Sequence, residues 1–213
     1  MDPAAARRRI ELILLLVVGP ALLALGPRRL VSLCILAGGV LSFVVLWRDP
    51  SFPRRELWNA GAARGRLGVV LVRTAVACAG ILAATALLAP ARLFALPRER
   101  PVVWVFIMVL YPISAYAQEL VYRTFFFHRY GALFAHRRVR VLVNAALFGW
   151  GHISVNNVVA VFLTAIVGVL FASTYERSRS TFLVTLEHAL YGDFVFSVGI
   201  GDLFYTTARW FGS

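Results

Sequence analysis

Long apolar runs constrain the fold of this chain more than any other feature of its sequence. Seven such runs follow one another, at residues 10–25, 30–47, 67–88, 102–122, 141–154, 158–174 and 181–204. A helix needs about 20 apolar residues to cross a bilayer, and lipid offers backbone polar groups no partner outside the segment itself. We therefore predict an all-α fold, a polytopic transmembrane bundle of about seven to eight helices. The run at 141–154 is short, so we expect a broken or partly embedded helix there.

The composition agrees with a membrane protein and excludes a soluble domain. Hydrophobic residues make up 60% of the chain and the mean hydropathy is +0.77, whereas soluble domains are about half apolar. The sequence divides into three parts: 1–101 with N-terminal helices and a basic loop, 102–204 with the polar motifs, and a short tail at 205–213. The loops are too short to hold a second domain.

Arginine placement predicts the orientation in the membrane. The formal net charge is +12 and every basic residue is arginine. Most of these arginines lie beside one set of helix ends, which predicts a cytoplasmic N-terminus. The smaller set, expected outside, comprises Arg28, Arg29, Arg92, Arg98, Arg100 and Arg209. The same placement accounts for the positive charge without a nucleic-acid partner.

The arginines also indicate where the protein resides. The basic loop at 48–66 is expected to lie on anionic lipid headgroups, so the bilayer itself is a partner. The lysine-free, alanine- and arginine-rich usage indicates a bacterial protein. We therefore predict a multi-pass protein of the bacterial inner (plasma) membrane.

Several ionisable side chains lie inside the apolar runs and are candidates for a functional site. They are Glu119, Arg123, His152, Glu187, His188 and Asp193. A charge at a helix centre costs about 2.5–3.5 kcal/mol, so each one needs a partner or a role. The spacing of Glu119 and Arg123 also allows a plain ion pair, and His152 could equally be an interhelical hydrogen-bond partner. Arg73 lies near a helix end, and we expect it to extend to the headgroups.

Glu119, His152 and His188 lie on three different runs but at compatible depths. A rise of about 1.5 Å per helical residue places all three in the inner part of the membrane. A carboxylate can accept a proton from water, and two imidazoles can hold a metal or act as an acid and an oxyanion donor. This set indicates peptide-bond hydrolysis in a cavity between helices, although proton-coupled carriers use similar residues.

Three motifs occur in order on successive runs within 102–204: "QELVYR", "FGWGH" and "EHALYGD". They resemble the three motifs of the CAAX prenyl protease and bacteriocin-processing (CPBP) family of intramembrane proteases, whose patterns are Glu-Glu-x-x-x-Arg, Phe-x-x-x-His, and a His followed four residues later by Asn or a similar residue. The resemblance implies an intramembrane (metallo)endopeptidase in which Glu119, His152 and His188 are catalytic. Gln118, Arg123, Phe148 and Asp193 take the supporting positions of these motifs.

The resemblance also implies a substrate and a cofactor. The substrate would be a membrane-associated peptide or protein, of the prenylated type in eukaryotic members. The cofactor would be zinc or another divalent metal held by Glu119, His152 and His188, although a metal-free glutamate mechanism is also argued for eukaryotic relatives. In family terms an acid and the second-motif His activate water, and the third-motif His stabilises the oxyanion.

Two departures from the family pattern matter for activity. Gln118 replaces the first family Glu, and a neutral amide cannot be a general base. Glu119, about 100° further around the helix, is the obvious substitute, and Glu187 is a second candidate. In the third motif Gly192 takes the position four after His188, and the acid is Asp193, one residue later. A distortion of the helix at Gly192 could bring Asp193 back to His188.

Two other functions stay open alongside the protease. A catalytically degenerate protein of the same fold could act as a binding or scaffold module, which the replacement by Gln118 would explain. A small proton-coupled carrier is less favoured, because the halves show no inverted repeat.

Overall fold

The structure is a computed structural model that describes residues 3–27 and 29–204. The predicted tail at 205–213 and two members of the predicted outer arginine set, Arg28 and Arg209, lie outside the described residues. Where the chain is described, every regular element is a helix, which confirms the predicted all-α fold.

The long helices are α3 (Arg29–Arg48), α4 (Ala60–Leu88), α6 (Pro101–Glu119), α8 (Arg137–Gly151), α9 (Val158–Ser178) and α10 (Thr181–Val198). Before them, α1 (Pro3–Ile13) and α2 (Gly19–Leu25) are joined by a π-helical segment, η1 (Leu14–Val18). A second π-helical segment, η4 (Leu120–Phe125), joins α6 to α7 (Phe126–Arg129). The connections contain α5 (Ala95–Glu99) and the 3₁₀ turns η2 (Arg54–Leu57), η3 (Pro90–Arg92), η5 (Gly131–Leu133), η6 (His152–Val155) and η7 (Gly201–Leu203).

All seven apolar runs are helical, and the described part of the chain is that of a multi-pass membrane protein. Four helical stretches are long and apolar enough to cross a membrane: Leu30–Arg48, Arg54–Leu88, Pro101–Arg129 and Val158–Ser178. The other three runs form shorter helices or, at the N-terminus, a helix interrupted by η1. The last run ends earlier than expected, because Gly199 takes a positive φ of 101° and closes α10.

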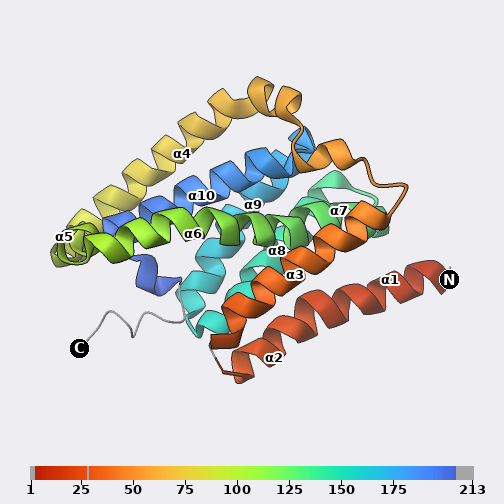
Figure 1. Ribbon diagram of the computed structural model, residues 1–213, viewed down its shortest axis with the longest axis horizontal. Helices are drawn as coiled ribbons and strands as arrows, with labels where there is room; N and C mark the ends of the chain where they lie inside the picture. The colour runs from red at the N-terminus through yellow and green to blue at the C-terminus, as the bar shows by residue number, and fades with distance from the viewer. Residues whose placement is uncertain (1–2, 28, 205–213) are drawn as a thin grey trace.

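Helix α10 lies in the middle of the bundle and contacts α4, α6 and α9 (Figure 1). Helix α8 pairs closely with α9, and α3 packs along α6. In Figure 1 the N-terminal helix α1–α2 lies at the margin of the bundle, beside α3. This arrangement brings the three motif-bearing segments α6–η4, α8 and α10 together around one interior region.

Small residues allow α8 and α9 to approach each other. A Cβ atom added to Gly149 of α8 would lie 2.6 Å from the Ala165 Cβ and 2.8 Å from the Val161 carbonyl oxygen. In return, a Cβ at Gly168 of α9 would lie 3.1 Å from the Ala145 Cα. Close helix packing at small residues is the usual way in which membrane helices associate. Gly149 therefore serves the packing of α8 against α9.

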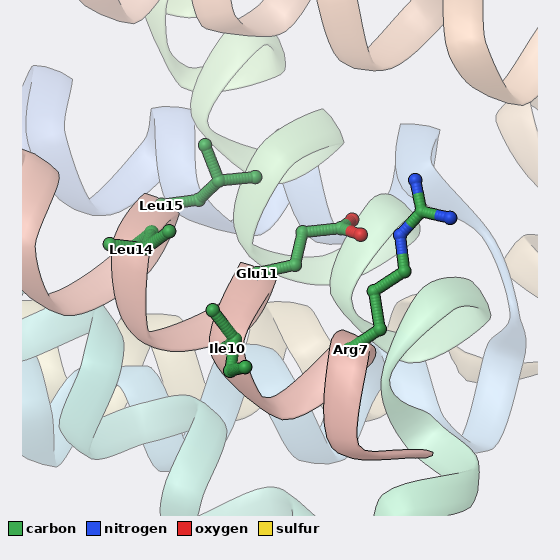
Figure 2. A pocket seen from close by; sticks show the side chains of 5 residues that line it. All are labelled: Arg7, Ile10, Glu11, Leu14 and Leu15. Carbon is green, nitrogen blue, oxygen red and sulfur yellow. The ribbon is translucent and has the colours of Figure 1, made fainter. Parts of the chain in front are cut away.

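The N-terminal helix is fixed to the bundle by polar contacts. Glu11 accepts two hydrogen bonds from the Arg129 guanidinium, at 2.9 and 2.8 Å, and one from the Tyr130 hydroxyl at 2.9 Å. Figure 2 shows the open pocket along this helix, which is lined by Arg7, Ile10, Glu11, Leu14 and Leu15. None of the motif residues lines this pocket, so it does not coincide with the predicted site.

Candidate active site

The first motif places Glu119 at the last residue of α6, immediately before the π-helical segment η4. Arg123 lies within η4, and both side chains are fully buried, with 0% of each exposed. The Arg123 Nε atom lies 3.3 Å from Glu119 Oε2. The predicted ion pair is therefore present inside the bundle, where neither charge reaches solvent.

Glu119 also contacts the third motif. The Nδ1 atom of His188, on α10, lies 2.8 Å from Glu119 Oε1. Because a carboxylate oxygen accepts hydrogen bonds, the His188 Nδ1–H is the donor, and Nε2 remains for another partner. Glu119 thus uses one oxygen for His188 and directs the other at Arg123. The acid and one of the two predicted histidines meet as expected.

Aromatic rings enclose the charged groups. The Arg123 guanidinium carbon lies 4.1 Å from the centre of the Phe148 ring and 5.5 Å from that of Phe171. Cation–π contacts of this kind are stronger when the pair is desolvated, as here. Phe171 also stacks on His188, with ring centres 4.8 Å apart. The second-motif phenylalanine therefore supports Arg123 directly.

His152 begins the 3₁₀ turn η6, just beyond the end of α8. Its Nδ1 atom lies 2.9 Å from the Phe148 carbonyl oxygen, so Nδ1–H is the donor and the neutral ring keeps a lone pair on Nε2. The Phe148 ring meets the His152 ring at 4.8 Å and the His188 ring at 5.6 Å, both edge to face. One phenyl ring therefore contacts both imidazoles.

Two supporting residues do not join this group. The Gln118 amide donates to the Ser114 hydroxyl, at 3.3 Å, on its own helix. Helix α10 runs unbroken through Gly192, where a side chain would overlap the Tyr111 ring. Gly192, where the sequence allowed a distortion, lies in regular helix and makes room for Tyr111. Asp193 is half-buried, and its Oδ1 atom makes no hydrogen bond within the described residues.

Glu187 is engaged in a separate polar cluster. Arg73 Nε of α4 donates to Glu187 Oε1 at 2.6 Å, and the Thr174 hydroxyl of α9 donates to Glu187 Oε2 at 2.7 Å. The Arg73 guanidinium also contacts the Thr174 hydroxyl and the Leu170 carbonyl. The expectation that Arg73 extends to the headgroups is wrong, because a buried carboxylate attracts it inward. With both oxygens bonded, Glu187 is less suited than Glu119 to accept a proton.

Glu119, His152 and His188 are the predicted metal ligands. Among residues 3–27 and 29–204, no group of three or more His, Cys, Asp or Glu side chains could hold a metal ion. Glu119 Oε1 accepts a hydrogen bond from His188, and Oε2 faces the Arg123 guanidinium without a hydrogen bond. Zinc or another divalent metal stays a prediction, which metal analysis of the purified protein would test.

Three residues that the sequence analysis did not single out, Phe171, Tyr111 and Asn144, also contact the motif segments. Phe171 and Tyr111 pack on His188, the latter edge to face with ring centres 5.8 Å apart. Asn144, fully buried on α8, donates to the Tyr122 carbonyl oxygen. An asparagine in an apolar run was a usable signal, as was the arginine at 73. The aromatic residues carried no signal, because such rings are common throughout this chain.

One of three comparisons with known proteins finds a match. Residues 100–192 match the family model described as Type II CAAX prenyl endopeptidase Rce1-like. No curated protein matches the chain, and no solved structure matches it. The matched segment contains Glu119, Arg123, His152 and His188. The Phe148 ring contacts the last three of these residues. This match over 100–192 supports the resemblance of the three motifs to the CAAX prenyl protease and bacteriocin-processing (CPBP) family of intramembrane proteases.

Proposed function

We propose that the protein is an intramembrane endopeptidase that hydrolyses a peptide bond of a membrane-associated substrate. The observation that carries this proposal is the buried hydrogen bond between Glu119 and His188, which joins the first and third motifs. Placing a carboxylate and an imidazole inside a bilayer costs free energy, so such residues usually mark a functional site. The similarity of residues 100–192 to the CAAX prenyl endopeptidase family model supplies the reaction class.

In the proposed reaction Glu119 and His152 activate a water molecule. Glu119 Oε2 makes no hydrogen bond within the described residues, and His152 keeps its Nε2 lone pair. Either atom can accept the proton that water loses as its oxygen attacks the scissile carbonyl carbon.

His188 stabilises the oxyanion and completes the reaction. Its Nδ1–H is fixed by Glu119, and in the protonated ring Nε2–H donates to the negative oxygen of the tetrahedral intermediate. The carbon–nitrogen bond then breaks, and the proton taken from water moves to the leaving amine. The products are a carboxylic acid and an amine, and transfer of the acid's proton, the second proton of the water, to the amine gives a carboxylate and an ammonium group.

A farnesylated CAAX peptide with a fluorophore and a quencher flanking the scissile bond tests this proposal. Purified protein in liposomes should cleave it, and His152→Ala and His188→Ala should each lower kcat by about 10²- to 10⁴-fold, the usual contribution of a positioned acid or base. His136→Ala is the matched control, because that histidine is exposed in the connection before α8. Cleavage at the wild-type rate by both site variants would refute the mechanism.

A binding module of the same fold is the second candidate, because Gln118 stands where the family has its first acid. A non-prenylated copy of the peptide separates the two functions and the two substrate classes. Binding of either peptide without cleavage by the wild-type protein would support the module. Cleavage of the farnesylated peptide alone would assign a prenylated substrate.

A further inference from the structure

The two π-helical segments share a feature that the proposed reaction does not use. In a π-helical turn the backbone is wider than in an α-helix, and its carbonyl groups do not all find the usual partner. In η1 the Val17 carbonyl oxygen accepts a hydrogen bond from the Trp150 indole, at 2.8 Å. In η4 the Tyr122 carbonyl oxygen accepts one from the Asn144 amide. Both donors lie on α8.

Asn144 is fully buried inside the helix bundle, where the loss of a hydrogen bond is costly. None of its surface is exposed, and an unpaired carbonyl group inside a bilayer has no water to replace the lost partner. The side chain must present its NH₂ group to the Tyr122 carbonyl, because two oxygens would repel. Its Oδ1 atom makes no hydrogen bond within the described residues. The side chain's hydrogen bond there is the one from its NH₂ group to the Tyr122 carbonyl oxygen.

The position of Asn144 on α8 links this bond to the active site. Asn144, Phe148 and His152 follow at four-residue intervals, so they lie along one face of α8 and its extension. Asn144 contacts η4, and Phe148 lies under the guanidinium of Arg123, which is itself part of η4. One stripe of α8 therefore holds the π turn, supports its arginine and carries the second-motif histidine.

The π turn sets the orientation of Arg123 relative to Glu119 in the first motif. Glu119 is the last residue before the widened turn and Arg123 lies within it. A change from π to α geometry would rotate Arg123 and all later residues relative to Glu119. The 3.3 Å contact between the two charges and the stacking of Arg123 on Phe148 both depend on this turn.

We propose that Asn144 is a positioning residue of this protein: by binding the Tyr122 carbonyl it maintains the π turn that sets Glu119 against His188 and Arg123 against Phe148. The expected effect of Asn144 on peptide cleavage rests on the proposed protease function. Its structural part, the stabilisation of η4, is independent of that function. The two parts are therefore tested with separate measurements.

Hydrogen–deuterium exchange of the full-length protein in nanodiscs tests the structural part. Asn144→Leu has similar volume but no donor, and should speed amide exchange across residues 119–127 by about fivefold, as expected for the loss of one net hydrogen bond. Trp150→Phe is the matched control, since it removes the corresponding bond to η1. It should speed exchange near residues 14–19 and leave 119–127 unchanged.

Cleavage of the farnesylated peptide tests the catalytic part. Asn144→Leu should lower kcat at least tenfold with KM nearly unchanged, whereas Trp150→Phe should keep the wild-type kcat. Asn144→Gln, which retains the donor, should recover part of the loss. Unchanged exchange at 119–127 in Asn144→Leu overturns the proposal whether or not the wild-type protein cleaves the peptide. Faster exchange with an undiminished kcat overturns it equally. Absence of wild-type cleavage, by contrast, counts against the protease function alone.

Discussion

A single carboxylate, that of Glu119, lies between an imidazole and a guanidinium inside the bundle. The sequence left two roles open for it, as a general base or as the partner of Arg123. The structure shows that one oxygen bonds His188 while the other faces Arg123. The ion pair and a role at the site are therefore compatible, because the two oxygens of one carboxylate serve different neighbours.

Glu119→Gln should abolish peptide cleavage, with a loss of about 10²- to 10⁴-fold in kcat, because an amide cannot accept the proton. Gln118→Glu should not increase the wild-type rate, since residue 118 bonds Ser114 and not the histidines. Both rates are measured with the quenched peptide. A fully active Glu119→Gln variant would exclude Glu119 as the base, and a large gain from Gln118→Glu would show that the natural protein is degenerate.

Glu187, which is fully buried, pairs with Arg73, which is partly exposed. Removing one partner leaves an uncompensated charge, so Arg73→Met should lower stability by about 3 kcal/mol. Arg73→Met/Glu187→Leu should recover most of this loss, because it removes both charges. Thermal unfolding in detergent measures the effect. The exposed pair of Arg92 and Asp202 is the control, and its removal by Arg92→Met should change stability little.

At the scale of elements, the helices and the order of the motifs were predictable, but their interior contacts were not. Apolar runs and polar interruptions are local in sequence, so they predicted seven helices and the residues Glu119, His152 and His188. The π turn at η4, the tight fit of Gly192 against Tyr111 and the contact of Arg73 with Glu187 depend on how distant helices pack. No local pattern specifies such packing.

The close contact between α8 and α9 gives a test at this scale. Gly149→Ala should lower stability by about 1–3 kcal/mol, because its Cβ would overlap Ala165 and force the helices apart. Gly80→Ala is the matched control, since nothing lies within 4 Å of a Cβ at that position of α4. It should be neutral or stabilising, because alanine favours helix. Equal melting temperatures for the two variants would contradict the packing described here.

At the scale of the whole molecule, the arginine distribution predicts which face of the membrane each connection occupies. The connection that contains Ser51 should be cytoplasmic, and the one that contains Arg98 should face outward, because α4 separates them. In a background with Cys34→Ala and Cys78→Ala, a membrane-impermeant maleimide applied to intact cells should label Arg98→Cys and not Ser51→Cys. The reverse pattern would invert the predicted orientation.

The contact of Arg73 with Glu187 reaches across the boundary of the family match. Arg73 belongs to α4, before the matched residues 100–192, whereas Glu187 directly precedes His188 within them. A chimaera that grafts residues 100–192 onto another protein's leading helices would therefore leave Glu187 buried without its ion-pair partner, unless the new helices supply a cation at the same depth. Arg73 in the first half of the chain supplies the counter-ion of Glu187 in the second half. The two halves therefore have to be exchanged together.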